Sequence, residues 1–360
     1  MALISQVCTA PRPAFRPRLL LWLLLLCFGP ESFVGASARP AAARTETSGT
    51  WSRQSSGTMT GLRGVYFTDA DHGWAVGGGG SILRTDDGGR KWLVKRHSSD
   101  DTFWDVYFTD RDNGWLLAER ALHKLKTNDE RRSYLLKTSD GGLSWTRVDI
   151  PGLDPNILLT RAAFATQTVG YVFGEYGTLF KTPDGGATWE VRPMPTRRLL
   201  LGGVFFADGR GWLVSAGATL LQTADNGESW REQGVRDVAN VKLHAITFGD
   251  QKIGWAVGSE GLIVKTTNGG NSWRVRPSPS NENLFDVSFI NATEGWAVGS
   301  NGTILHTADG GETWTPQKSG TTHPLARVFF DKTSGRGFAV GFGGTVLTYT
   351  PAGDSRLTER

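Results

Sequence analysis

Hydrophobic and polar positions alternate along the chain in short runs, and the same set of runs returns about every 40 residues. In one unit, residues 284–318, the runs read LFDVSFI, GWAVGS, GTILHTA and ETWTPQK. Each run is rich in β-branched or aromatic residues and is bounded by Gly, Asn or Asp, so each predicts a β-strand. No segment keeps an apolar helical stripe for three turns. Four short strands in such a period are typical of one blade of a β-propeller.

Two tryptophan series mark this repeat. The first closes each unit, at Trp51, Trp92, Trp145, Trp189, Trp230, Trp273 and Trp314. The second follows a glycine, at Trp74, Trp115, Trp212, Trp255 and Trp296, with Tyr171 and Phe338 in its two missing places. Trp22 and Trp104 fall outside both series. We interpret the repeated tryptophans as packing contacts between blades, because an aromatic ring of this size stabilises a core by several kcal/mol.

The turn before each closing tryptophan has the form Thr-x-Asp-Gly-Gly-x-x-Trp. Its acidic positions are Asp87, Asp140, Asp184, Asp225 and Asp309, with Asn268 in one copy. A calcium loop needs further oxygen ligands at alternate positions, and these are absent. The aspartates are expected instead to accept backbone N–H groups within the turn.

Glycines also cluster between the second and third strands of most units, as in GGGG (77–80) and GSEG (258–261). A phosphate-binding loop would occur once and would open a helix. A cluster that recurs at one place in the repeat predicts a hairpin turn, because glycine tolerates the positive φ that such turns demand.

The number of blades depends on how the two ends of the chain meet. Six units are complete, and a seventh, from Ala326, lacks the closing turn and tryptophan. The segment GTWSRQSSGT (49–58) resembles ETWTPQKSGT (312–321), so the strand around Trp51 is expected to complete the last blade. The prediction is an all-β, seven-bladed β-propeller over residues 49–350, with four antiparallel strands per blade, followed by a C-terminal tail at 351–360.

The N-terminal segment has the form of an export signal. Arginines precede an apolar run from Leu19 to Phe28, and small residues at 36–38 offer a cleavage site. We expect a signal peptide at 1–38 and a flexible linker at 39–48. An uncleaved membrane anchor is the alternative, although about ten apolar residues are short for a membrane span. The expected location is the periplasm or the extracellular space, or the thylakoid lumen in a photosynthetic host, and any association with a membrane is expected to be peripheral.

Cysteine and charge narrow the classes of function. Cys8 and Cys27 both lie in the export segment, so the mature chain is neither a cysteine enzyme nor a zinc-thiolate protein. Without that segment the formal charge falls from +4 to +2, too balanced to indicate a nucleic-acid partner. The histidines show no ligand spacing, so no metal or other cofactor is expected. His306 occupies a strand position, expected to face solvent, that it shares with Arg84, Lys137, Lys181 and Lys265.

The unit GWAVG-x-x-G-x-I-L-x-T-x-D-G-G-x-x-W resembles the Asp-box (BNR-type) repeat of the photosystem II stability and assembly factor family. The resemblance covers residues 50–350. It implies a monomeric propeller without enzymatic activity, which holds a protein client such as a membrane-complex subunit, or the tail of one, during assembly.

The resemblance also implies an arginine patch on one face of the ring. We align the first strands on Phe67, Phe108, Phe164, Phe206, Phe248, Phe289 and Phe330. Three residues earlier stand Arg161 and Arg327, expected at the channel mouth, and Arg63 neighbours the same position. Loops between blades add Arg192, Arg197, Arg198, Arg274 and Arg276. These eight are the predicted protein-binding residues, because the guanidinium fork suits carboxylates; the alternative is that they are ordinary solvated charges.

Asp boxes also occur in sialidases and other glycoside hydrolases, so a carbohydrate-directed hydrolase or lectin is the alternative function. Such an enzyme needs an arginine cluster with a Tyr/Glu pair, or two opposed carboxylates. No acid/base pair stands out from the repeats, and no catalytic residue is assigned. The second blade carries a charged insertion at 120–133, which predicts an exposed hairpin extension or a mobile loop.

Overall fold

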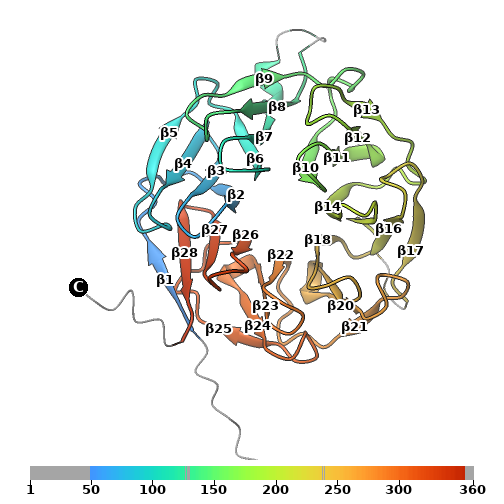
Figure 1. Cartoon of the computed structure of the whole chain (residues 1–360). Helices are drawn as coiled ribbons and strands as arrows, with labels where there is room; N and C mark the ends of the chain where they lie inside the picture. The colour runs from blue at the N-terminus through green and yellow to red at the C-terminus, as the bar shows by residue number, and fades with distance from the viewer. Residues whose placement is uncertain (1–48, 126, 128–129, 237, 239, 353–360) are drawn as a thin grey trace, which may run out of the picture. The chain divides into compact units, whose positions relative to one another are not determined.

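The computed structural model describes residues 49–125, 127, 130–236, 238 and 240–352. Within them the chain forms seven four-stranded antiparallel sheets around a central channel (Figure 1). The predicted seven-bladed propeller is therefore confirmed. The expected signal peptide and linker, and the tail from residue 353, lie outside the described residues.

Each blade runs from an innermost strand at the channel to an outermost strand at the rim. Blade 1 consists of β2 (Leu62–Phe67), β3 (Gly73–Gly77), β4 (Ser81–Thr85) and β5 (Leu93–Arg96). Blade 2 consists of β6 (Thr102–Phe108), β7 (Gly114–Glu119), β8 (Ser133–Thr138) and β9 (Thr146–Val148). Blade 3 consists of β10 (Leu159–Phe164), β11 (Gly170–Gly174), β12 (Leu179–Thr182) and β13 (Glu190–Val191). Blade 4 consists of β14 (Leu200–Phe205), β15 (Gly211–Ser215), β16 (Thr219–Thr223) and β17 (Arg231–Gly234). Blade 5 consists of β18 (Leu243–Phe248), β19 (Gly254–Gly258), β20 (Ile263–Thr266) and β21 (Arg274–Arg276). Blade 6 consists of β22 (Leu284–Phe289), β23 (Gly295–Gly299), β24 (Ile304–Thr307) and β25 (Thr315–Gln317). Blade 7 consists of β26 (Leu325–Phe330), β27 (Gly337–Gly341), β28 (Thr345–Thr350) and β1 (Thr50–Gln54).

The described helices are four single 3-10 turns, η1 (Leu122–Lys124), η2 (Glu175–Gly177), η3 (Ser259–Gly261) and η4 (Ser300–Gly302). None of the described helices has the length and apolar character needed to cross a membrane.

The N-terminal strand closes the ring as predicted. β1 pairs antiparallel with β28 over five residues, from Thr50 opposite Thr350 to Gln54 opposite Val346. Trp51 meets Phe330 edge-on, with ring centroids 5.9 Å apart and planes at 88°. In blade 6, Trp314 meets Phe289 at 5.9 Å and 86°. Trp51 therefore occupies the place of the closing tryptophan in blade 7.

The second tryptophan series packs between neighbouring blades. The indole of Trp255 stacks on Phe289 of the next blade, with ring centroids 3.4 Å apart, and its Nε1 donates a hydrogen bond to the carbonyl of Gly310 at 2.8 Å. The same contact recurs at the other interfaces, as Trp74–Phe108, Trp115–Phe164, Tyr171–Phe205, Trp212–Phe248, Trp296–Phe330 and Phe338–Phe67. These aromatic pairs join the seven sheets into one ring.

The Asp-box turns are closed by hydrogen bonds of their own side chains, as expected. Asp140 accepts hydrogen bonds from the Ser144 amide at 2.9 Å, the Ser144 hydroxyl at 2.6 Å and the Thr138 hydroxyl at 2.7 Å. The turns at Asp87, Asp184, Asp225, Asn268 and Asp309 repeat the bond from the main-chain amide four residues later. Among the described residues, no three or more His, Cys, Asp or Glu side chains gather as a metal site.

We expect these turns to weaken in acid. Hydrogen bonds, foremost from the hydroxyl four residues later, lower the pKa of Asp140, Asp184 and Asp225 to about 2. A carboxylate whose pKa is lower in the folded than in the unfolded chain stabilises the fold above about pH 4, and this contribution is lost as the pH falls towards 2. A D140N/D184N/D225N variant has no such carboxylates to protonate. We would measure the free energy of unfolding of both proteins with denaturant at several pH values from 6 to 2. The variant should be less stable than the wild type at pH 6, and this difference should shrink as the pH falls. A difference that stays constant would contradict the stabilising role of these carboxylates.

The glycine clusters form hairpin turns, with one correction to the expected residue preference. In the β19–β20 turn, both Glu260 (φ 57°) and Gly261 (φ 70°) adopt left-handed backbone, so the first such position accepts a side chain. Glycine is needed at the second position, because a Cβ on Gly261 would lie 1.8 Å from the carbonyl oxygen of Ser280. That carbonyl belongs to the connection to the next blade.

The strand position of His306 was expected to face solvent, and this is wrong. His306, Lys181 and Lys265 are all buried. Each lies opposite an aromatic residue of the neighbouring strand, as Lys265 does opposite Trp255. The two lysines pair with an acidic residue in the Asp-box turn of the next blade, Lys181 with Glu228 and Lys265 with Glu312, each at 2.7 Å. Blade 7 lacks this turn, and His306 Nε2 lies 3.4 Å from Glu294 of its own blade.

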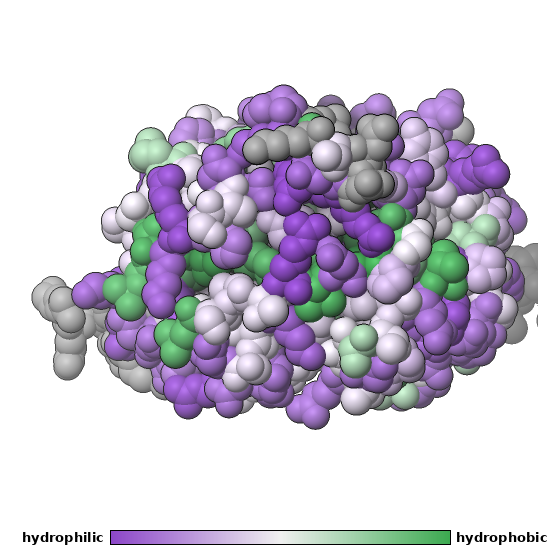
Figure 2. Space-filling model, turned by 90° about the horizontal axis from the view of Figure 1, so that it is seen from above, coloured by the Kyte–Doolittle hydropathy of each residue, from purple (hydrophilic) through white to green (hydrophobic). Residues whose placement is uncertain are grey.

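The ring has two faces. One carries the turns between first and second strands and the Asp-box turns, and we call it the Asp-box face. The other carries the turns between second and third strands and the chain segments between blades, and we call it the connection face. Between them, the rim around β9 is largely hydrophilic, and its hydrophobic residues form an interrupted row (Figure 2).

Candidate functional site

The innermost strand of each blade carries an irregularity that exposes additional side chains to the channel. We number the residues of this strand from Leu62, Phe103, Leu159, Leu200, Leu243, Leu284 and Leu325, which leaves Thr102 of β6 before the first. In all seven blades the pairing register shifts between the first and third residues. The third to fifth residues then line a channel of about 210 Å³. The second residues lie between the channel and the connection face.

The third residues are Gly64, Asp105, Arg161, Gly202, Ala245, Asp286 and Arg327. The sequence alignment placed blade 4 one residue too late, on Phe206. In the structure Phe205 pairs with Gly211, as Phe67 pairs with Gly73, so Gly202 occupies the channel position. The two adjacent phenylalanines make the register ambiguous in the sequence.

Arg327 is held by the two channel aspartates. Its Nη2 forms an ion pair with Asp105, and its Nε lies 4.0 Å from Asp286 Oδ2. Each aspartate also accepts a backbone N–H from the following blade, Asp105 from Ala162 at 3.2 Å and Asp286 from Val328 at 2.9 Å. Burial raises the pKa of both carboxyl groups to about 6, and the charge of Arg161 opposes the rise. These contacts fix Arg327 and link blades 2, 3, 6 and 7 across the channel.

Arg161 differs from Arg327 in having a free guanidinium edge. Its Nε donates a hydrogen bond to the carbonyl of Leu201 at 3.2 Å. Within the described part of the chain, its two Nη groups make neither a hydrogen bond nor an ion pair. The channel wall beside it is built by Gly202, Gly203 and Ala245, which leave room next to the cation. A guanidinium with two free N–H groups on one edge is suited to bind a carboxylate with two hydrogen bonds.

Two aromatic residues and an arginine lie together at one corner of the channel mouth on the connection face. The guanidinium of Arg63 lies 4.1 Å from the ring centroid of Trp104 and 5.5 Å from that of Phe342. Trp104 is fixed by a 2.7 Å hydrogen bond from its Nε1 to Glu119, which also pairs with Arg132 at 2.7 Å. Burial lowers the pKa of Arg63. This corner of the mouth therefore combines a cation with rigid aromatic surface.

The structure separates the eight predicted arginines into two groups. Arg63, Arg161 and Arg327 lie on innermost strands, and Arg197 and Arg198 lie in the segment between β13 and β14, on the connection face. The remaining three are away from the channel mouth, which corrects their expected placement in loops beside it. Arg274 and Arg276 belong to outermost strand β21, and Arg192 directly follows outermost strand β13. Arg192 and Arg276 pair with Glu228 at 3.2 Å and Glu312 at 3.3 Å.

Sequence reasoning missed the residues that complete this site. Asp105 and Asp286 stand at the same aligned position as Arg161, but their pairing with Arg327 joins blades that are distant in sequence. Trp104 carried a usable signal, because it falls outside both tryptophan series. A residue that breaks a structural repeat is a candidate for a specific contact.

The insertion of blade 2 extends the β7–β8 hairpin, which is the first of the two structures expected for residues 120–133. The amide of Arg120 donates to the carbonyl of Arg132 at 2.8 Å, which continues the hairpin beyond Glu119. Arg120 also pairs with Glu130 at 3.4 Å. The described residues of the insertion lie on the connection face.

The fold and its turns define the chain as a seven-bladed propeller of the Asp-box class. The model of the family described as "Photosynthesis system II assembly factor YCF48" matches residues 43–155, 143–235, 194–279, 235–316 and 277–350. The chain belongs to this family, which confirms the resemblance seen in its repeats.

Two curated relatives share shorter stretches with it. The chain is 36% identical over 93 residues to the chloroplastic photosystem II stability/assembly factor HCF136 of Arabidopsis thaliana, covering 24% of this chain and 23% of that protein. It is 26% identical over 152 residues to the photosystem II assembly lipoprotein Ycf48 of Synechococcus sp. (strain CC9902), covering 41% of each. The matched stretches thus span about a quarter and two fifths of these relatives.

Solved structures show the same fold at low identity. A YCF48 bound to a D1 peptide matches with a TM-score of 0.68 and 22% identity, covering 83% of this chain and 94% of that one. YCF48 from Cyanidioschyzon merolae matches with a TM-score of 0.66 and 21% identity, over 83% and 98%. The GH74 enzyme of Niastella koreensis matches with a TM-score of 0.65 and 16% identity, over 83% and 53%. Assembly factors and hydrolases therefore share this architecture, and the functional site must distinguish them.

Proposed function

We propose that this chain is an exported, non-enzymatic propeller scaffold that binds a carboxylate-bearing segment of a membrane-complex subunit. The segment binds at the channel mouth on the connection face. The observation that carries this proposal is the free edge of Arg161 inside the channel, beside small residues and below an aromatic mouth. Membership of the YCF48 family supports an assembly role.

The geometry favours a narrow, extended client segment. The channel, at about 210 Å³, admits one carboxylate and a few neighbouring atoms. A carboxylate that reaches Arg161 brings the preceding residues of its chain against Arg63, Trp104 and Phe342. Either a C-terminus or an Asp or Glu side chain supplies the required group. Among its relatives, a YCF48 has been solved with a D1 peptide, which supports a photosystem subunit as the client class.

A hydrolase is the weaker alternative for this channel. Asp105 and Asp286 are its two opposed carboxylates, which is the minimum for glycoside hydrolysis. Both, however, accept backbone N–H groups and both lie against Arg327. These contacts support a structural role, because each carboxyl group is engaged by a backbone amide of the following blade and lies beside Arg327.

The relatives also bear on location. One is a cyanobacterial lipoprotein and another is chloroplastic. Together with the N-terminal signal pattern, they support export to the periplasm or outer surface, or to the thylakoid lumen in a photosynthetic host. A monomer that associates with the membrane only peripherally fits this role.

Removing the guanidinium of Arg161 is expected to weaken client binding about tenfold or more, as the loss of a charge-assisted hydrogen-bond pair should. We would measure the Kd of a D1-derived peptide for the wild type, R161Q and R161K by calorimetry. An R274Q variant, altered on the rim, should bind normally.

Amidating the C-terminus of the peptide distinguishes the two sources of the carboxylate. A tenfold loss with the wild type and none with R161Q would identify the terminus as the group bound by Arg161. An unchanged Kd for R161Q with the unmodified peptide, at unchanged stability, would refute the proposal.

A further inference from the structure

Cations lie on the rim around the strand that closes the ring. In blades 6, 7 and 1, the outermost strand and the segment after it comprise residues 314–324, 51–61 and 92–101. We call these three segments the basic seam, and its cations are Lys318, Arg53, Lys95 and Arg96, with His97 and His323. Its aspartates, Asp100 and Asp101, stand directly before β6, where Asp100 pairs with Lys124 and Asp101 accepts a hydrogen bond from Tyr134. In blade 2, by contrast, the rim cation Arg147 pairs with Asp149 of its own segment.

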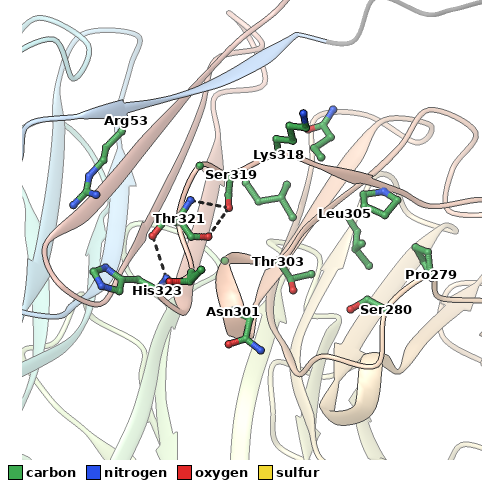
Figure 3. A pocket seen from close by; sticks show the side chains of 16 residues that line it. Arg53, Pro279, Ser280, Asn301, Thr303, Leu305, Lys318, Ser319, Thr321 and His323 are labelled. Carbon is green, nitrogen blue, oxygen red and sulfur yellow. Dashed lines mark hydrogen bonds between the residues drawn. The ribbon is translucent and has the colours of Figure 1, made fainter.

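Two neighbouring grooves are hollowed into the basic seam. The larger, of about 830 Å³, lies over blade 6 and is lined by Arg53, Lys318, His323 and several hydroxyl groups. Arg53 and His323 lie on one side of it, and Pro279 and Ser280 lie on the other (Figure 3). The second groove, of about 500 Å³, is lined by residues 53–59 together with Arg96 and the turn of Gly343 and Gly344. No carboxylate lines either groove within the described residues, and Arg53 belongs to both.

The cations of the basic seam are available to a partner. Arg53, Arg96 and Lys318 make no ion pair or side-chain hydrogen bond with any described residue. The rim arginines Arg192 and Arg276, by contrast, form ion pairs with Glu228 and Glu312. A cluster of unpaired cations around a hollow attracts anionic groups and raises their local concentration.

We propose that the basic seam is a second binding surface, which takes an acidic, extended polypeptide segment lying across β1 from one groove to the other. Arg53 stands at the centre of this path, with Lys318 and Arg96 on its two sides, so carboxylates spaced along one segment can reach all three. Hydroxyl groups at Ser280, Thr303 and Thr322 offer hydrogen bonds to its backbone, and exposed Met59 offers an apolar contact.

Shape favours a polypeptide over a membrane surface. An anionic bilayer is attracted by cations on a flat or convex face. Here the cations border two hollows of about 830 Å³ and 500 Å³, which have room for a single extended chain. The surface is also distinct from the channel, because none of its lining residues contributes to the Arg161 site.

The test uses a fluorescein-labelled peptide of four Glu-Ser repeats, acetylated and amidated at its ends, with a Gln-Ser peptide as its neutral control. Fluorescence anisotropy should show that R53E/R96E/K318E binds the acidic peptide about tenfold or more weakly than the wild type. A matched variant, R236E/K252E/K332E, makes the same change in net charge at exposed cations elsewhere and should lose less than about threefold. Both triple variants are also compared in an R161Q background, which removes any binding of a glutamate to the channel, so that failure at the channel and failure at the seam give different results.

Three results would overturn the proposal. They are an equal loss in both triple variants, unchanged binding in the seam variant, and seam-dependent binding to phosphatidylglycerol vesicles without binding to the acidic peptide. If the charge-reversed seam variant does not fold, R53Q/R96Q/K318Q serves in its place, with the same expected direction and a smaller loss.

Discussion

Replacing Trp51 with alanine is expected to lower the free energy of unfolding by about 3 kcal/mol, as for other large-to-small changes at packed aromatic residues. Trp51 contacts Phe330 and Tyr349, with ring centroids 5.9 Å and 5.3 Å away. Its Nε1 also donates a 2.9 Å hydrogen bond to Gln317 of the neighbouring blade. The substitution removes all three contacts from the strand that closes the ring.

Urea unfolding followed by intrinsic fluorescence or circular dichroism would measure this loss. Arg53→Ala is the matched control, because it lies on the same strand, is exposed and should change stability by less than about 0.5 kcal/mol. An equally small effect for Trp51→Ala would show that β1 adds little to the ring.

Gly311→Ala is expected to destabilise the propeller by about 3 kcal/mol, through backbone strain and a steric clash together. Gly311 has φ of 80° in the Asp-box turn of blade 6, and an added Cβ would lie 2.5 Å from Nε1 of Trp255. Trp255 is fully buried between two blades and has no space to move. The turn must then shift or the Trp255–Gly310 hydrogen bond must break.

Gly320→Ala separates the two contributions. Gly320 also has a positive φ, 71°, but no atom lies within 4 Å of the position of an added Cβ. It should cost about 1 kcal/mol, from backbone strain alone. Similar losses for the two variants in thermal and urea unfolding would contradict the clash at Trp255.

The repeat made most of the fold predictable. Fourteen aromatic positions in two series defined the blades, and the likeness between the segments at Trp51 and Trp314 predicted how the ring closes. Errors arose where the repeat does not specify the position of a residue within its blade. Phe205 and Phe206 are both plausible core residues, and only the pairing of Phe205 with Gly211 decides between them.

The site was less predictable, for physical reasons. Residue type indicated carboxylate recognition at Arg161, but not that Arg327 is already paired with Asp105, 222 positions away in the sequence. The position of Arg276 in its unit could not show that it faces Glu312 of the next blade. Charge balance between non-neighbouring residues depends on the closed ring, which local patterns do not encode.

The pairing of β1 with β28 also sets the order of events in biosynthesis. β1 is made first among the strands and its partner β28 last, so the ring cannot close until nearly the whole chain has been synthesised. Until then, the edge of β1 stays without its neighbour and the last aromatic interface, between Phe338 and Phe67, is not formed. A chain that stops before residue 345 would keep most of its blades and still be an open arc.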